Sequence, residues 1–143
     1  MSTDRANMIA FDLNPRLEGD SHPVSDLELC AVRLMKDANY PWLLLIPRRK
    51  DLIEIIDLAP AEQTKLMEET GKVSAALKAA TNCEKLNVAA IGNVVSQLHV
   101  HVVARFREDP AWPAPVWGAV PPVPYEGTKA NDLISALQEA LAE

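Results

Sequence analysis

The 143-residue sequence has no long hydrophobic run, no excess of positive charge and almost no cysteine. No apolar run approaches the roughly 18 residues of a membrane-spanning helix, and the first ten residues lack the apolar core of a signal peptide. The net charge of −6 argues against a general nucleic-acid-binding surface. The two cysteines, Cys30 and Cys83, lie far apart and fit reduced, buried thiols. We therefore expect a cytoplasmic protein that binds neither nucleic acid nor a membrane.

The composition supports one globular domain over residues 1–143. Hydrophobic residues make up 48% of the chain and charged residues 24%, which is enough to build a full core. No internal repeat is present. The stretch 108–127 is rich in proline, so it is expected to be an arm without regular structure. We place the core at about 27–106 and a C-terminal helix at about 129–142.

Local patterns in the sequence predict four strands and two helices. The apolar run Trp42–Ile46, ended by Pro47, is typical of a strand buried on both faces. Pro60 suits the first position of a long helix, and Thr128 suits the N-cap of the last one. Residues 1–26 are expected to be irregular apart from a short piece at Ile9–Leu13. The expected strands are at about 27–34, 42–46, 86–90 and 93–106, and the helices are at about 60–80 and 129–142.

Three polar residues alternate with apolar ones near the end of the core, namely Gln97, His99 and His101. Strict alternation with β-branched residues predicts a half-buried strand, on which these three side chains share one face. At a rise of about 3.3 Å per residue, the two imidazoles lie roughly 6.6 Å apart along the strand. That gap is wide enough for a tetrahedral group such as a phosphate to be held between them.

Two histidines on one face suit phosphoryl or nucleotidyl transfer. A neutral imidazole nitrogen is a competent nucleophile, and a neighbouring imidazole can donate to a phosphate oxygen or to the leaving group. The attacking ring needs an acceptor for its other N–H, so that the lone pair faces the substrate. The alternative is a polar strand face with two solvated histidines, and the spacing alone favours that alternative.

A metal site is a second alternative, because His-x-His strands supply zinc or iron ligands in several β-barrel proteins. Zinc needs at least three protein ligands. The next acidic residue, Glu108, lies past the end of the strand, and the remaining histidine, His22, lies in the irregular lead-in. The sequence therefore offers no third ligand, and we expect no metal.

The stretch Gln97–Val103 resembles the histidine-triad (HIT) signature, in which three histidines alternate with apolar residues, with Gln97 in place of the first histidine. The likeness extends upstream. Leu44–Lys50 resembles the family's apolar strand that ends in Ile-Pro and basic residues, although the family often has His at the position of Lys50. Leu86-Asn87 and Gly92-Asn93 resemble the positions before the triad. The resemblance covers roughly 27–105.

This resemblance implies an α+β fold, with an antiparallel sheet of about five strands, one long helix packed on it and a C-terminal helix. It implies a homodimer that binds a small-molecule nucleotide, uses no cofactor and transfers or hydrolyses nucleotidyl groups through a nucleotidyl-histidine intermediate. By position, His99 matches the nucleophile. His101 matches the histidine that contacts the phosphate, and Gln97 occupies the first triad position.

The resemblance also suggests substrate-binding residues. Asn87 matches a phosphate-side Asn, and Asn93 matches the polar residue after the glycine. Asp37 is the candidate for the ribose-binding acid. Independently of the family, Gly92 allows the backbone to approach an anion closely.

Two further segments suggest contacts with a ligand. Arg48 and Arg49 are candidates for added positive charge, although a solvated basic turn is the simpler interpretation. The tryptophans of the arm segment Ala111–Gly118 offer stacking surface for a base, or a packing contact. Two functions remain open: a nucleotidyl hydrolase or transferase acting on a phosphoanhydride, phosphoramidate or dinucleoside polyphosphate, and a nucleotide-binding module with little turnover.

Overall fold

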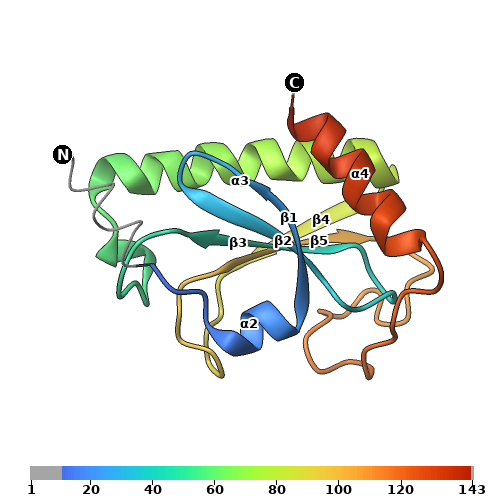
Figure 1. Ribbon diagram of the computed structural model, residues 1–143. Coiled ribbons are helices and arrows are strands. Elements are labelled where there is room, and N and C mark those ends of the chain that lie inside the picture. Colours follow the sequence, from blue (N-terminus) through green and yellow to red (C-terminus); the bar gives the residue numbers. More distant parts are fainter. Residues whose placement is uncertain (1–10, 143) are drawn as a thin grey trace.

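The computed structural model describes residues 11–142 and shows a five-stranded antiparallel sheet with helices, as expected for the α+β class (Figure 1). The strand order is β1-β2-β3-β5-β4. The strands are β1 (Ser21–Asp26), β2 (Cys30–Met35), β3 (Trp42–Pro47), β4 (Lys85–Ala89) and β5 (Val100–Arg105). The helices are α2 (Pro15–Gly19), the 3-10 turn η1 (Ile55–Asp57), α3 (Pro60–Thr81) and α4 (Lys129–Leu141).

The strand β3 is the centre of the sheet, and all six of its residues are buried, as the apolar run predicts. It pairs with β2 on one side and with β5 on the other. Leu44 lies directly opposite His101 in this register. The register therefore pairs β5, which carries His101 and is itself fully buried, with the fully buried strand β3.

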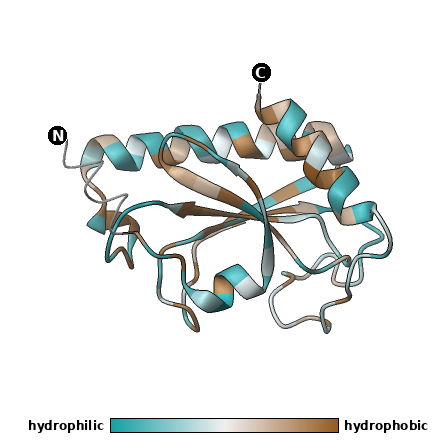
Figure 2. Cartoon of the chain, in the orientation of Figure 1, coloured by the Kyte–Doolittle hydropathy of each residue, from teal (hydrophilic) through white to brown (hydrophobic). Residues whose placement is uncertain are grey.

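The sheet has an apolar cluster on each face, because residues alternate between the two sides of each strand. One cluster contains Leu43 and Leu45 of β3 and packs under α3 and α4. The other contains Trp42 and Leu44, together with Val116 of the arm. Figure 1 shows α3 and α4 on one side of the sheet and α2 and the arm on the other, and Figure 2 shows how strongly apolar β3 is.

The long helix α3 begins at Pro60, as predicted, and ends at Asn82 in the left-handed conformation. Its Glu69 is buried, and the two carboxylate oxygens accept the backbone N–H groups of Leu29 and Cys30 at 2.9 and 2.8 Å. A buried carboxylate needs such donors to offset the loss of hydration. These bonds fix the helix against the turn that joins β1 to β2.

The prediction of an irregular lead-in is wrong for residues 15–26, which form α2 and β1. The sequence of β1 does not show a strand pattern, because Pro23 interrupts it. Proline is tolerated there because β1 lies at the sheet edge and a register shift follows between Pro23 and Ser25. Gln138 of α4 donates to the Val24 carbonyl at 2.8 Å. Part of the expected piece Ile9–Leu13 lies outside the described residues.

Two other expectations need correction, and one is confirmed in part. The strand β5 begins at Val100 rather than near residue 93, so Gln97 and His99 lie in the preceding loop. Thr128 is the N-cap residue of α4, as predicted, but its hydroxyl donates to the Asp132 carboxylate at 3.0 Å and does not cap the helix backbone. The core also extends beyond 27–106, because Val24 and Leu137 are fully part of it. No helix within residues 11–142 is both long and apolar enough to cross a membrane.

Candidate active site

The His99 ring is buried and fixed in one tautomer by its own loop. Its Nδ1 lies 2.6 Å from the backbone carbonyl oxygen of Gln97. A carbonyl oxygen only accepts, so Nδ1 carries a hydrogen, and in the neutral ring the lone pair is on Nε2. The acceptor that a nucleophilic histidine requires is therefore a main-chain group two residues before it.

The His101 ring is fixed in the opposite sense. The indole Nε1–H of Trp42 donates to its Nδ1 at 2.9 Å, so that Nδ1 is an acceptor and Nε2 carries the hydrogen. Burial and, to a lesser extent, the neighbouring His99 together lower the pKa of His101 to about 4. The Trp42 donor adds to this preference, because a protonated Nδ1 would place two N–H groups against each other. His101 is thus a neutral donor at physiological pH.

The two rings contact each other, with centroids 4.9 Å apart and planes at 64°. This arrangement corrects the expectation of a gap for a phosphate between them. His99 lies before the strand, so the regular strand spacing does not apply. Trp117 of the arm packs edge-on against His101 at 5.3 Å. A substrate must therefore approach along the free Nε2 edges, where one ring offers a lone pair and the other an N–H.

A groove extends from the histidines across this face of the sheet. Its first part, about 310 Å³ in volume, is lined by both histidines, Trp117 and the loop residues Gly92 and Asn93. Its second part, about 460 Å³, reaches the arm and Asp37. The two parts share the residues Arg16, Asp20, Met35 and Trp42. The groove therefore combines apolar and aromatic surface with two basic residues, Arg16 and Lys36, and two acidic residues, Asp20 and Asp37.

A family model for the HIT domain matches residues 16–108 of the chain. The chain belongs to the HIT family. A comparison with curated proteins gives no match.

Three solved HIT structures are similar to this chain over nearly their whole length. The histidine triad protein of Bradyrhizobium japonicum is 51% identical with a TM-score of 0.90, covering 92% of this chain and 98% of that one. The protein of Sinorhizobium meliloti is 45% identical with a TM-score of 0.90, covering 93% and 98%. The protein of Marinobacter aquaeolei is 41% identical with a TM-score of 0.89, covering 92% and 96%.

The side chain of Gln97, in the first position of the HIT signature, does not join the two histidines. Its Nε2 donates to the Asp12 carbonyl and its Oε1 accepts the Asn14 N–H, both at 2.8 Å. Asn14 is the N-cap of α2, and α2 contributes Arg16 to the groove. Because Gln97 lies in a loop, its side chain does not share a strand face with His99 and His101, contrary to what the alternation predicts. Its side chain instead holds the segment that leads into α2.

The predicted HIT substrate-binding residues separate into two groups. Gly92, with φ of 66°, and Asn93 line the groove beside His99. Asn87 lies on the same sheet face, opposite Val103, and its Oδ1 accepts from the Arg105 guanidinium at 2.8 Å. Asp37 is buried, and its Oδ1 accepts the backbone and side-chain N–H groups of Asn39. The structure therefore brings Gly92 and Asn93 to the histidines and places Asp37 at the far part of the groove.

The basic turn does not face the histidines. The Arg48 guanidinium donates to the carbonyls of Leu27 and Glu28, and Arg49 pairs with Glu62 at 2.6 Å. Among residues 11–142, no cluster of three His, Cys, Asp or Glu side chains has a geometry that could hold a metal ion. His22 lies on β1, at the opposite edge of the sheet from β4. The described residues thus offer no metal ligand set at His99.

Sequence reasoning missed three groove residues of this HIT domain. Arg16 and Asp20 were missed because α2 is only five residues long and gives no periodic signal. Trp42 was assigned to the core, although a tryptophan in an otherwise aliphatic run is a sign that its N–H needs a partner. Of the two arm tryptophans, Trp117 lies at the histidines, whereas Trp112 lies over the Arg105 guanidinium at 5.5 Å.

The lowered pKa of His101 predicts a pH-dependent loss of stability. Below pH 6.5 the unfolded chain protonates His101, whereas the folded chain does not do so until about pH 4. The free energy of unfolding should therefore fall across that window, by about 3 kcal/mol at the lower end. The variant His101→Gln keeps an acceptor for Trp42 and cannot titrate. Urea unfolding of both proteins from pH 7 to 4 should show a smaller loss in the variant, and parallel curves would contradict the assignment.

Proposed function

We propose that this HIT protein is a nucleotidyl hydrolase or transferase that forms a covalent nucleotidyl intermediate on His99. The observation that carries the proposal is the pair of opposite tautomers, one set by the Gln97 carbonyl and the other by Trp42. A nucleophile and a hydrogen-bond donor are thereby held side by side before any substrate arrives. Such preorganisation reduces the reorganisation that the reaction would otherwise require.

The reaction follows from these two nitrogens. The Nε2 lone pair of His99 attacks phosphorus and forms a P–N bond, while the bond from phosphorus to the leaving group breaks. The Nε2–H of His101 donates to a phosphate oxygen and stabilises the charge that develops there. Water, or another acceptor, then attacks phosphorus, breaks the P–N bond and releases the nucleotide. The cycle uses no cofactor and no metal.

The groove supports a nucleotide as the substrate. Trp42 and Met35 offer an apolar floor for a base, and Trp117 offers an aromatic side wall. Gly92 and Asn93 line the groove beside His99, and we expect them to contact the phosphate. The proposed roles of Asn87 at the phosphate and Asp37 at the ribose remain predictions, since each is already engaged within the protein.

The variant His99→Ala should abolish nucleotidyl release without unfolding the protein. The ring is buried but is held by a single hydrogen bond to its own loop, so little of the core depends on it. Intact-mass analysis of the quenched wild type with a panel of nucleotides should show a nucleotidyl adduct, which is absent from the variant. Activity should survive chelation. Full activity in His99→Ala would exclude the covalent mechanism.

The variant Gln97→His should change kcat/KM by no more than about tenfold, or ~1.4 kcal/mol. The reason is that the Gln97 side chain holds the start of α2 and does not touch the histidine rings. The loss should appear mainly in KM, because α2 lines the groove. Gln97→Glu is the matched control, since it keeps the acceptor for Asn14 and loses the donor to Asp12.

A different outcome for Gln97→His would favour a nucleotide-binding module. In that case the wild type binds nucleotide without forming the His99 adduct, and turnover rises steeply from near zero in the variant. The departure of Gln97 from the HIT signature is the observation that keeps this second function open.

We further propose a homodimer formed through β4. This strand is a sheet edge, and its Val88 is 51% exposed, whereas the opposite edge strand β1 is packed against α4. Open edge strands are usually covered, and a stable dimer buries upwards of about 1,200 Å². Sedimentation at micromolar concentration should show a dimer that the edge variant Val88→Pro weakens. A wild type that sediments only as a monomer would contradict this assembly.

A further inference from the structure

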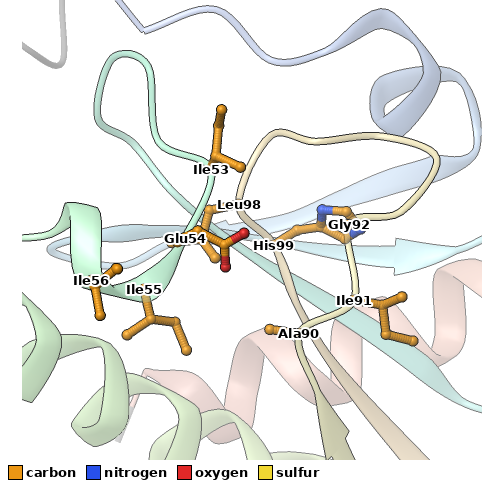
Figure 3. A pocket seen from close by; sticks show the side chains of 9 residues that line it. All are labelled: Ile53, Glu54, Ile55, Ile56, Ala90, Ile91, Gly92, Leu98 and His99. Carbon is orange, nitrogen blue, oxygen red and sulfur yellow. The ribbon is translucent and has the colours of Figure 1, made fainter.

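The two histidines of the site are enclosed to different extents. His99 lines the groove and also a second hollow of about 270 Å³, which it shares with Glu54 and Gly92 (Figure 3). His101 is not among the described residues that line this hollow. The rings of His99 and His101 contact each other, so the rest of the cover over His101 has to come from its other neighbours.

Three aromatic rings pack against the His101 ring, and each comes from a different segment. The ring centroid of His99 lies at 4.9 Å, that of Trp117 at 5.3 Å and that of Trp42 at 5.7 Å. His99 and Trp42 belong to the matched HIT residues, whereas Trp117 belongs to the arm, which follows the point where that match ends. The arm therefore adds a cover that β3 and the loop before β5 do not supply.

Hydrogen bonds anchor the arm at both of its ends. Near its start, Arg105 donates to the Asp109 carboxylate and to the Ala114 carbonyl, each at 2.8 Å. Near its end, the Ala38 N–H donates to the Val123 carbonyl at 2.6 Å. The segment between these anchors carries the tryptophan that faces the site.

The Trp117 ring lies between His101 and the surrounding water. Trp117 is half-buried, whereas His101 is only 7% exposed. The Trp117 Nε1 is buried without a hydrogen-bond partner among the described residues, so packing against His101 and Trp42 is what holds the ring. Removal of this ring would therefore open His101 to solvent.

Charged neighbours have a smaller effect on His101 than the loss of water. The residues of β3 and β4 that pair with it are apolar. Its titratable neighbours within the described part of the chain are His99, in ring contact, and Arg16 and Asp20, which line the same groove. Arg16 and Asp20 lie 3.8 Å apart and largely offset each other. Burial is therefore the main cause of the lowered pKa of His101, and His99 is the lesser one.

We propose that the arm shields the donor histidine of the site, with Trp117 as a positioning residue that excludes water from the His101 ring. Without this cover, Nδ1 of His101 would gain a proton more readily. That proton would oppose the Trp42 N–H and break the bond that orients the ring. The catalytic role of His101 rests on the proposed function, whereas its shielding does not. The arm thus widens the pH range in which His101 is a neutral, oriented donor.

An NMR titration of the histidine rings in the full chain, without substrate, tests the shield. In Trp117→Ala the pKa of His101 should rise from about 4 by at least about one pH unit, because water reaches the ring. Trp117→Phe keeps an aromatic cover and should titrate close to the wild type. Val123→Ala changes an arm residue that is 46% exposed and should leave the titration unchanged. An unchanged pKa in Trp117→Ala, or an equal rise in Val123→Ala, would overturn the proposal.

The pH dependence of unfolding distinguishes a shield from ordinary packing. Lost packing alone lowers the free energy of unfolding by the same amount at every pH. A raised pKa of His101 in the folded state also reduces the loss between pH 7 and 4, so Trp117→Ala should give the flatter curve. Parallel curves would contradict the shield. If Trp117→Ala does not fold, Trp117→Leu keeps part of the packing and should show a smaller rise in the pKa, and the absence of a rise there would have the same meaning.

The anchor of the arm provides an independent test. Asp109→Asn weakens the pair with Arg105 and should raise the pKa of His101 less than Trp117→Ala does. In the double variant the rise should equal that of Trp117→Ala alone, because the cover is already absent. A sum of the two single effects would show that the arm acts on His101 without Trp117, which would overturn the role given to that residue.

Activity measurements separate this inference from the proposed function. The kcat/KM of Trp117→Ala relative to Trp117→Phe should fall as the pH is lowered from 8 to 5, because only the first variant exposes His101. A His99 adduct with a constant ratio would reject the effect of the shield on the donor. A shifted titration with no adduct in any protein would reject the proposed function and leave the shield in place.

Discussion

The arrangement of residues on the sheet face that carries the histidines depends on the contacts of the buried Arg105 guanidinium. Arg105 is 1% exposed and pairs with Asp109 through two contacts of 2.8 and 3.1 Å. It also donates to Asn87 and to the Ala114 carbonyl, each at 2.8 Å. Burial opposes ionisation of Asp109, but hydrogen bonds from Arg105 and three backbone N–H groups hold its pKa below the usual range. One buried cation thus joins β5, β4 and the arm, and an arm fixed in this way can present Trp117 to His101.

The two histidines illustrate how a buried strand pair controls chemistry. Trp42 and His101 can meet only because β3 and β5 are neighbours in the sheet, and their bond determines which nitrogen of His101 carries the hydrogen. His99 receives its tautomer from the loop just before β5. Burial favours the neutral form of His101, so its contribution is directional hydrogen bonding rather than positive charge. Because burial lowers the pKa of His101, it also lowers the free energy of unfolding in acid.

The parts of the fold that could be predicted are those with a strong local pattern. The run that became β3 and the helix α3 were assigned almost to the residue, because β3 is a continuous apolar run ended by Pro47 and α3 has apolar residues at helical spacing after Pro60. The strand β1 was missed because Pro23 breaks its pattern. The start of β5 was placed too early because alternation continues through Gln97 and His99, although the main chain there is already a loop.

The sequence by itself determined the family resemblance, the α+β class and the pair His99 and His101, because these depend on residue type and spacing. The tertiary structure decided what Gln97 and Trp42 do. The two hydrogen-bond partners of Gln97 lie 83 and 85 residues away in the sequence. Trp42 and His101, which bond to each other, are 59 residues apart. Local spacing carries no information about contacts over such separations. They arise only when the sheet order places β5 beside β3 and packs α2 against the same face.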